Sequence, residues 1–234
     1  VLADSDDDRK SEKAILCIFH SGKRISFEMN ERIENASKKM DIIIISDSNI
    51  ENNKFKNATV IVENYKSKWV SLFKAFNVIK KYSIIGVIMD IEKQATSEVP
   101  YSMYSGENWT RWENIVGQYN YIRNVIDLFD KKSSLGILVA QKPVFGVFFS
   151  NGGFSQEAKM QSRYFWSIAD NLQLGNKIQS EYIADYSDSF WCRTELLLQF
   201  LNAITKCENK EQILSNSEAL DKLFPYFAQT KGFY

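Results

Sequence analysis

Four short apolar runs constrain the fold of this chain more than any other feature. They cover residues 14–19, 41–46, 58–62 and 83–89, and polar residues bound each of them. Continuous β-branched runs of this length are typical of strands covered on both faces, as in a parallel sheet. Segments with helical periodicity lie between them, at residues 30–40 and 68–82. The pattern predicts an α/β fold with a mostly parallel sheet flanked by helices.

The order of the predicted elements changes after Asp90. A loop is expected at residues 94–108, followed by a helix that begins with the capping box Thr110-x-x-Glu113 and runs to Phe129. Residues 135–139 form another predicted strand, and residues 143–153 a strand or loop ending in a turn. Further helices are expected at 155–172, 194–206 and 218–224, the last disturbed at Pro225.

Length and charge limit the classes of protein to consider. The 234 residues suit a single domain at residues 13–234, preceded by a charged linker at residues 1–12. Lys plus Arg and Asp plus Glu both number 29, so no nucleic-acid partner is expected. No apolar run reaches the roughly 18–20 residues that span a bilayer. Three cysteines favour a reducing compartment over a disulfide framework.

The sequence alone gives little reason to assign a metal-binding or catalytic role to the single histidine, His20. Cys17-x-x-His20 has half the spacing of a zinc knuckle, but no second ligand pair follows, and Cys17 is more simply a buried strand residue. One histidine also argues against Ser-His-Asp and Cys-His hydrolases.

Two acidic residues stand where the fourth predicted strand ends. Asp90 and Glu92 are separated by one residue. Ligands of open α/β sheets bind at the carboxyl ends of the strands. Two carboxylates there can reach a divalent cation that bridges a diphosphate, as Asp-x-Asp does in nucleotide-sugar enzymes of the GT-A type. The alternative is a solvated acidic cap.

Two other turns allow two interpretations each. Lys66 and Lys68 stand where a helix begins after the third strand, and Ser21-Gly-Lys-Arg24 follows the first strand. Both turns could hold phosphate through the backbone N–H groups and basic side chains there, and the alternative for both is a solvated basic turn. Neither has the glycine spacing of a Walker loop or a dinucleotide fingerprint.

Aromatic side chains gather at two places. Phe190 and Trp191 are followed by Arg193, which sets an aromatic face for a sugar ring beside a cation for phosphate, although such a pair also occurs in a core. A second group surrounds the loop after Asp90 and suits either a sugar acceptor or a loop packed on itself; it comprises Tyr101, Tyr104, Trp109 and Trp112.

Over most of residues 14–234 the chain resembles the rhamnan synthesis protein F family of bacterial polysaccharide glycosyltransferases. The resemblance is carried, in order and spacing, by residues 113–129, Leu135-Gly-Ile-Leu138 with Pro143 and Phe149, Phe190-Trp-Cys-Arg193, and residues 224–234. It implies a GT-A-like fold in a cytoplasmic enzyme peripheral to the inner face of the membrane. It also implies transfer of rhamnose or a related sugar from dTDP-rhamnose or a similar nucleotide sugar to a lipid-linked glycan, with other transferase domains as possible partners.

Departures from the family pattern keep a second hypothesis open. The His-Asp-Lys-Lys type segment after the fourth strand is Met89-Asp-Ile-Glu-Lys93 here, and Tyr65–Lys68 lacks the expected Gly and Asp. Acidic elements expected ahead of Phe224 are also missing. The alternative is a catalytically degenerate module that binds glycan or docks a partner transferase.

The expected site combines these elements. Asp188 is the candidate catalytic base, and Asp90 and Glu92 are the candidate ligands of Mg²⁺ or Mn²⁺. The donor-binding set comprises Asn64, Asp90, Glu92, Lys93, Trp191 and Arg193. The arrangement requires Asp90 and the segment from Phe190 to Arg193 to line one hollow.

Overall fold

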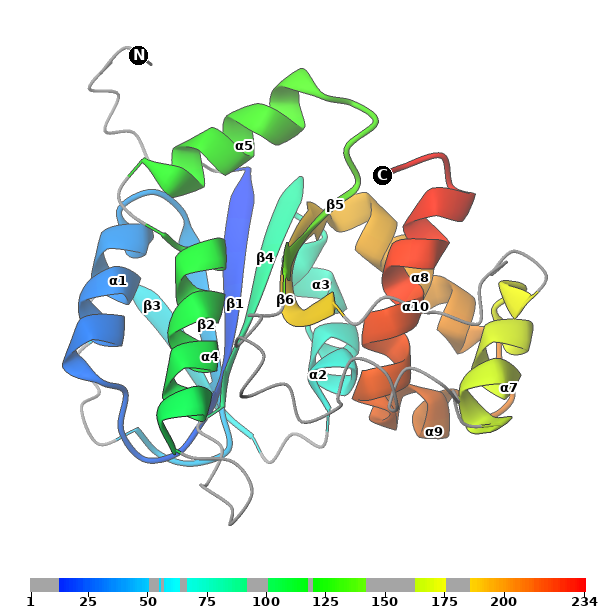
Figure 1. Ribbon diagram of the computed structural model, residues 1–234, viewed down its shortest axis with the longest axis horizontal. Coiled ribbons are helices and arrows are strands. Elements are labelled where there is room, and N and C mark those ends of the chain that lie inside the picture. The colour runs from blue at the N-terminus through cyan, green and yellow to red at the C-terminus, as the bar shows by residue number, and fades with distance from the viewer. Residues whose placement is uncertain are drawn as a thin grey trace.

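A six-stranded sheet forms the centre of the structure (Figure 1). The computed structural model describes residues 13–50, 55, 57–63, 67–91, 101–117, 120–141, 163–175 and 186–234. The strand order is β3-β2-β1-β4-β6-β5. The strands are β1 (Ala14–Ser21), β2 (Asp41–Ser46), β3 (Ala58–Val62), β4 (Ile84–Ile91), β5 (Ile137–Gln141) and β6 (Tyr186–Arg193). The first four are parallel to one another, and β6 runs antiparallel to both β4 and β5. The mostly parallel α/β sheet predicted from the sequence is confirmed.

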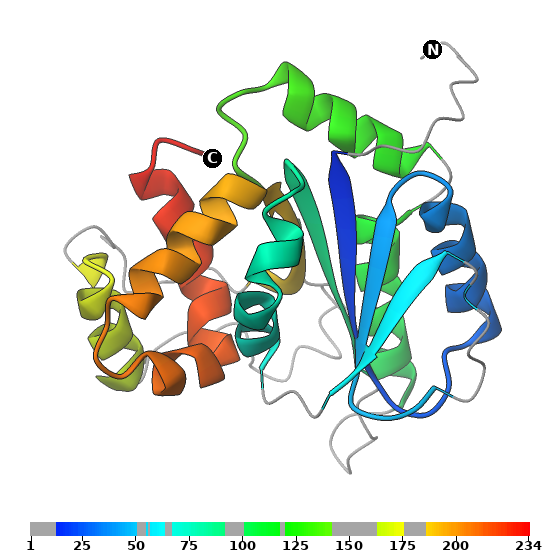
Figure 2. The same cartoon turned by 180° about the vertical axis from the view of Figure 1, so that it is seen from behind.

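Helices cover both faces of the sheet, which explains why β1, β2 and β4 are apolar without alternation. One face carries α1 (Phe27–Ser37), α4 (Tyr101–Ile115) and α5 (Tyr121–Lys131). The other face, seen in Figure 2, carries the remaining helices. These are α2 (Lys68–Lys74), α3 (Phe76–Ile79), α7 (Arg163–Asn171), α8 (Thr194–Thr205), α9 (Lys210–Ser215) and α10 (Ser217–Thr230).

The prediction of one continuous helix at residues 110–129 is wrong in two respects, because the helix begins earlier and the segment forms two separate helices. Helix α4 already begins at Tyr101, so Thr110 lies inside it and donates from Oγ1 to the Gly106 carbonyl at 2.8 Å instead of capping a first turn. The helix then ends, because Gly117 adopts a left-handed φ of 55°. Helix α5 starts separately after this turn.

Two C-terminal elements also differ from expectation. Helix α10 continues through Pro225 to Thr230, because Phe224, Phe227 and Ala228 are buried on either side of the proline and their burial outweighs one missing backbone hydrogen bond. The segment ending in Phe190-Trp-Cys-Arg193, for which no strand was predicted, is the antiparallel strand β6.

Within the described residues, no helix has the length and apolar character needed to cross a membrane.

Candidate functional site

The strand order places a topological switch point between β1 and β4. The chain passes from β1 outward to β2 and β3, and then returns to the other side of β1 to form β4. Connections therefore leave these two strands in opposite directions, and ligands of open α/β sheets bind outside the carboxyl ends of the strands at such a point. The side chains at that edge are the first candidates for a site.

His20 and Asp90 meet at this switch point. They are register partners near the ends of β1 and β4, and the two side chains share the face covered by α4. His20 Nδ1 lies 2.8 Å from Asp90 Oδ2, and the two residues are 4% and 5% exposed. Two residues 70 positions apart in the chain thus form one buried pair.

Helix α4 supplies the other partners of Asp90. Asn108 and Trp112 lie one helical turn apart and so project from the same side of the helix. Asn108 Nδ2 donates to Asp90 Oδ1 at 2.8 Å, and Trp112 Nε1 donates to the same oxygen at 3.0 Å. The carboxylate therefore receives three side-chain hydrogen bonds.

These contacts determine the charge of Asp90 and the tautomer of His20. Burial alone raises the pKa of Asp90, but the hydrogen bonds from His20, Asn108 and Trp112 outweigh it and hold the pKa below its ordinary value. An ionised carboxylate can only accept hydrogen bonds, so the proton between the two side chains is on His20 Nδ1. His20 Nε2 is buried and has no hydrogen-bond partner among the described residues.

The loop after β2 carries a second carboxylate close to His20. Asp47 Oδ2 accepts from Ser21 Oγ at 2.7 Å, and Asp47 Oδ1 accepts from the Gly22 N–H at 3.2 Å. Burial raises the pKa of Asp47, but these bonds, a bond from Ser48 and attraction to His20 lower it below the ordinary value. The turn from Ser21 onward, one of the two possible phosphate sites, is thus tied to the loop after β2.

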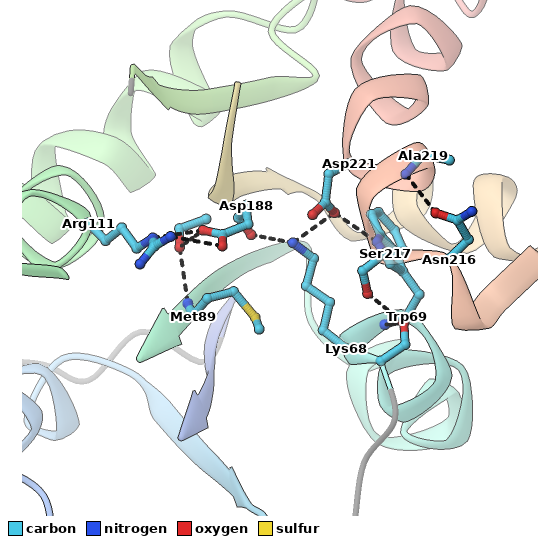
Figure 3. A network of polar contacts seen from close by, with 11 residues as sticks. Lys68, Trp69, Met89, Arg111, Asp188, Asn216, Ser217, Ala219 and Asp221 are labelled. Atoms are coloured by element: carbon cyan, nitrogen blue, oxygen red, sulfur yellow. Dashed lines mark hydrogen bonds and ion pairs between the residues drawn. The ribbon is translucent and has the colours of Figure 1, made fainter. Parts of the chain in front are cut away.

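Asp188, the expected base, lies at the same edge of the sheet but is paired with an arginine (Figure 3). Arg111 of α4 contacts both carboxylate oxygens, with Nε 2.9 Å from Oδ1 and Nη2 3.1 Å from Oδ2. Ser189 Oγ also donates to Oδ1 at 3.2 Å and accepts from the Met89 N–H at 3.0 Å. This bidentate pairing commits both carboxylate oxygens of Asp188 to the protein's own donors.

Lys68 is the next member of this network. Its side chain is buried, donates to the Asp188 carbonyl, and forms an ion pair at 2.8 Å with Asp221 Oδ1 on α10. Trp69 Nε1 donates to the same Asp221 oxygen at 2.8 Å. Burial raises the pKa of Asp221 to about 6, although Lys68 opposes that rise. Lys68, considered for phosphate from its sequence position, is committed to the interior, and Lys66 lies outside the described residues.

Trp191 and Arg193 do not reach this edge. Arg193 is the register partner of Ile84, which begins β4 six residues before Asp90, and six strand residues span about 20 Å. Trp191 is 1% exposed, its ring packs over Gly86, and its Nε1 donates to the Ile115 carbonyl at 2.8 Å. The requirement that Asp90 and the segment ending at Arg193 line one hollow is therefore not met.

Both side chains have structural roles instead. Arg193 donates to the carbonyls of Phe129, Lys132 and Leu135 at 2.7–2.8 Å, and thereby satisfies acceptors at the end of α5 and in the following turn. The core location of Trp191 excludes stacking on a sugar, and the Arg193 fork is occupied by protein carbonyls. Neither residue is retained as a donor contact.

The metal expectation finds little support in the described residues. Asn64, Glu92 and Lys93 lie outside them. Asp90 has three of its four lone-pair positions occupied by protein donors, so it is better suited to anchoring His20 than to ligating a cation. No group of three or more His, Cys, Asp or Glu side chains within the described ranges could hold a metal ion.

Sequence reasoning identified Asp90 but missed its three partners. The signals that could have found them are positional. His20 follows the first apolar run just as Asp90 follows the fourth, and parallel strands align such ends. Asn108 and Trp112 have i, i+4 spacing, but they fell in and beside the segment taken as a loop.

Comparison with known proteins identifies a family. The family described as rhamnan synthesis protein F matches residues 18–232, which is nearly the whole chain. No curated protein and no solved structure matches the chain significantly.

Proposed function

Because the chain belongs to the rhamnan synthesis protein F family and has a role in polysaccharide synthesis, we propose that it is a glycosyltransferase with its site at the carboxyl edge of β1 and β4. It transfers a sugar, rhamnose or a related one, from a nucleotide sugar to a growing glycan. The donor class, exemplified by dTDP-rhamnose, the lipid-linked acceptor and attachment to the inner membrane face belong to this proposal. So do a GT-A-like architecture and the association with other transferase domains.

The observation that supports a site here most strongly is the orphaned Nε2 of His20. A buried polar atom without a partner is costly, and native proteins keep such atoms mainly where a ligand or water completes the bond. This atom lies at the switch point, where the strand topology itself predicts a ligand. A sugar or ribose hydroxyl is a suitable donor to it.

The test is a titration followed at the imidazole of His20. Because the chain has a single histidine, one set of side-chain ¹H–¹⁵N signals reports on this site without ambiguity. Added dTDP-rhamnose should shift these signals and raise the melting temperature. A ligand at 100 times its Kd stabilises the folded state by about 2.7 kcal/mol. A panel of other nucleotide sugars, each with and without MnCl₂, tests the donor and the expected cation.

Two controls make the result specific. Free rhamnose should leave the spectrum unchanged at the same concentration. Asp130→Asn alters an exposed carboxylate near the beginning of β1, at the opposite edge, where it contacts only Lys13 among the described residues. This variant should bind the donor as the parent does. If no nucleotide sugar shifts His20 or the melting temperature, the transferase proposal is wrong.

A second candidate is a module that binds glycan or docks a partner transferase without catalysing transfer. Its support is that Asp90 and Asp188 are both bonded to the protein's own donors. Glycan binding with no response to any nucleotide sugar would identify this function.

A further inference from the structure

We propose that His20 Nε2 is the proton acceptor in the transfer, and that Asp90 is the positioning residue that holds the imidazole in the required tautomer. This inference rests on the proposed function and assigns the chemistry of that site. It replaces Asp188 in the role of base and Asp90 in the role of metal ligand.

The carboxylates of the edge do not offer a comparable acceptor. Arg111 occupies both oxygens of Asp188. Asp47 is held by Ser21 and the Gly22 N–H, and Asp90 by its three donors. Two buried acceptors of this edge, His20 Nε2 and Asn108 Oδ1, have no hydrogen-bond partner among the described residues. Of the two, only the imidazole nitrogen is basic enough to take a proton, because an amide oxygen is a very weak base.

The geometry matches the requirements of a general base. A base needs a free lone pair aimed at the substrate and a second group that fixes its orientation. Asp90 Oδ2 accepts from Nδ1 at 2.8 Å, which leaves the lone pair of the neutral ring on Nε2. The same carboxylate stabilises the imidazolium that forms when Nε2 takes a proton.

The transfer step is then a single displacement. The acceptor hydroxyl oxygen forms a bond to the anomeric carbon of the donor sugar as its proton passes to His20 Nε2. The bond from the anomeric carbon to the diphosphate oxygen breaks, and its electron pair leaves with the nucleoside diphosphate. The imidazolium later returns its proton to water. The displacement inverts the anomeric configuration.

Asp90→Asn provides a direct test of the positioning role. Asn108 and Trp112 both donate to Oδ1, so this atom must remain an oxygen in the asparagine side chain. The new amide group then takes the place of Oδ2 and donates to His20 Nδ1. The imidazole proton is forced onto Nε2, which removes the lone pair from the substrate side.

Long-range ¹H–¹⁵N spectra show which ring nitrogen carries the proton. We expect the Nδ1–H tautomer in the parent protein at pH 8, and the Nε2–H tautomer in a folded Asp90→Asn variant. Asp130→Asn should retain the parental tautomer. The parental spectrum is informative even if Asp90→Asn fails to fold, since a parent with its proton on Nε2 overturns the proposal.

Kinetics test the catalytic role. His20→Asn keeps an amide donor near the position of Nδ1 and deletes Nε2. Release of dTDP from dTDP-rhamnose, with a membrane extract as acceptor source, should fall about 100-fold or more in kcat, as expected for loss of a general base. The KM for the donor should change less than about threefold, since binding of the diphosphate does not require the base.

The pH profile separates a base from a structural residue. His20 faces two titratable groups among the described residues, Asp90 on β4 and Asp47 after β2. Both have lowered pKa values and stay ionised between about pH 5 and 8, where histidine titrates. An acidic limb that is present in the pH profile of the parental kcat and absent from the residual activity of His20→Asn supports the assignment of the base, whereas the same limb in both proteins overturns it.

The outcomes distinguish the two proposals. If the parent binds no nucleotide sugar, the proposed function fails. If it binds and turns over donor but His20→Asn keeps its kcat, or changes only KM, the transferase function stands and the assignment of the base is overturned.

Discussion

Replacing Lys68 with methionine should destabilise the fold strongly, and the penalty should depend on pH. The ammonium group is fully buried and neutralises Asp221 on α10 at 2.8 Å. Methionine keeps the aliphatic stem but leaves the carboxylate with Trp69 Nε1 as its one remaining described donor. Removing one partner of a buried ion pair costs about 3–5 kcal/mol, so Lys68→Met should lose that much unfolding free energy at pH 7.

The pKa of Asp221 gives the sign of the pH dependence. Its folded-state pKa of about 6 lies above the ordinary 3.8, so the native state binds more protons than the unfolded state between these values. The contribution of this group to stability is therefore present below pH 3.8 and is lost as the pH rises towards 6. The loss amounts to about 3 kcal/mol at about 1.4 kcal/mol per pKa unit.

Without Lys68 the pKa of Asp221 rises further. Protonation at acidic pH then removes the unpaired buried charge that destabilises the variant. Urea unfolding of the parent, Lys68→Met, Asp221→Asn and the double variant at pH 5 and pH 7 measures each effect. Lys68→Met should cost less at pH 5 than at pH 7. The double variant should be more stable than Lys68→Met by about 2 kcal/mol, because no unpaired charge remains while the amide oxygen still accepts from Trp69. A Lys68→Met penalty below about 1 kcal/mol at both pH values, or strict additivity in the double variant, would refute this reasoning.

Four further substitutions test the packing around the sheet. Gly86→Ala places a Cβ 2.9 Å from the Trp191 ring, so thermal or urea unfolding should show a loss of about 1–3 kcal/mol, and an unchanged midpoint would contradict the packing described here. Gly117→Ala combines a positive φ with a Cβ 2.6 Å from a neighbouring side chain, whereas Gly232→Ala shares the positive φ but meets no atom within 4 Å. Gly117→Ala should therefore lower the unfolding free energy clearly more than Gly232→Ala, which introduces only backbone strain of about 1 kcal/mol. Equal losses of unfolding free energy would rule out the steric contribution. Arg193→Lys replaces a three-carbonyl fork by one ammonium and should accelerate amide hydrogen exchange in the last turn of α5; unchanged exchange there would show that the fork does not hold the helix end.

The parts of the fold that were predictable are those decided by local sequence. The strands β1, β2 and β4 follow from apolar runs, because a strand covered on both faces has no polar side to interrupt the run. Strand β3 has a similar run, but it lies at the edge of the sheet with Ile61 and Val62 exposed, so its predicted cover on both faces is wrong. Strand β6 was missed because its first half, Tyr186-Ser-Asp-Ser189, is polar. The break at Gly117 was missed because a continuous apolar stripe hides a single left-handed residue.

The site was predictable only in part, for a physical reason. Asp90 is recognisable because an acid after a buried strand faces the ligand edge. Its meeting with His20 depends on the spatial order of the strands, which no local pattern contains. Trp191 was misassigned because burial and stacking both select aromatic residues, and only the register of β6 shows that this ring packs over Gly86.

The polar contacts that cross the sheet at β6 have a mechanical consequence. Arg111 belongs to the helix layer on one face, while Lys68 and Asp221 belong to the layer on the other, and Asp188 contacts both Arg111 and Lys68 (Figure 3). A shift of α4 on ligand binding would move Arg111 and, through it, Asp188 on β6. The contacts of Lys68 with Asp188 and Asp221 would transmit that movement to α10. Such coupling is reciprocal. If ligand binding changed the equilibrium for the packing of α10 by some factor, a change in that packing would alter ligand affinity by the same factor.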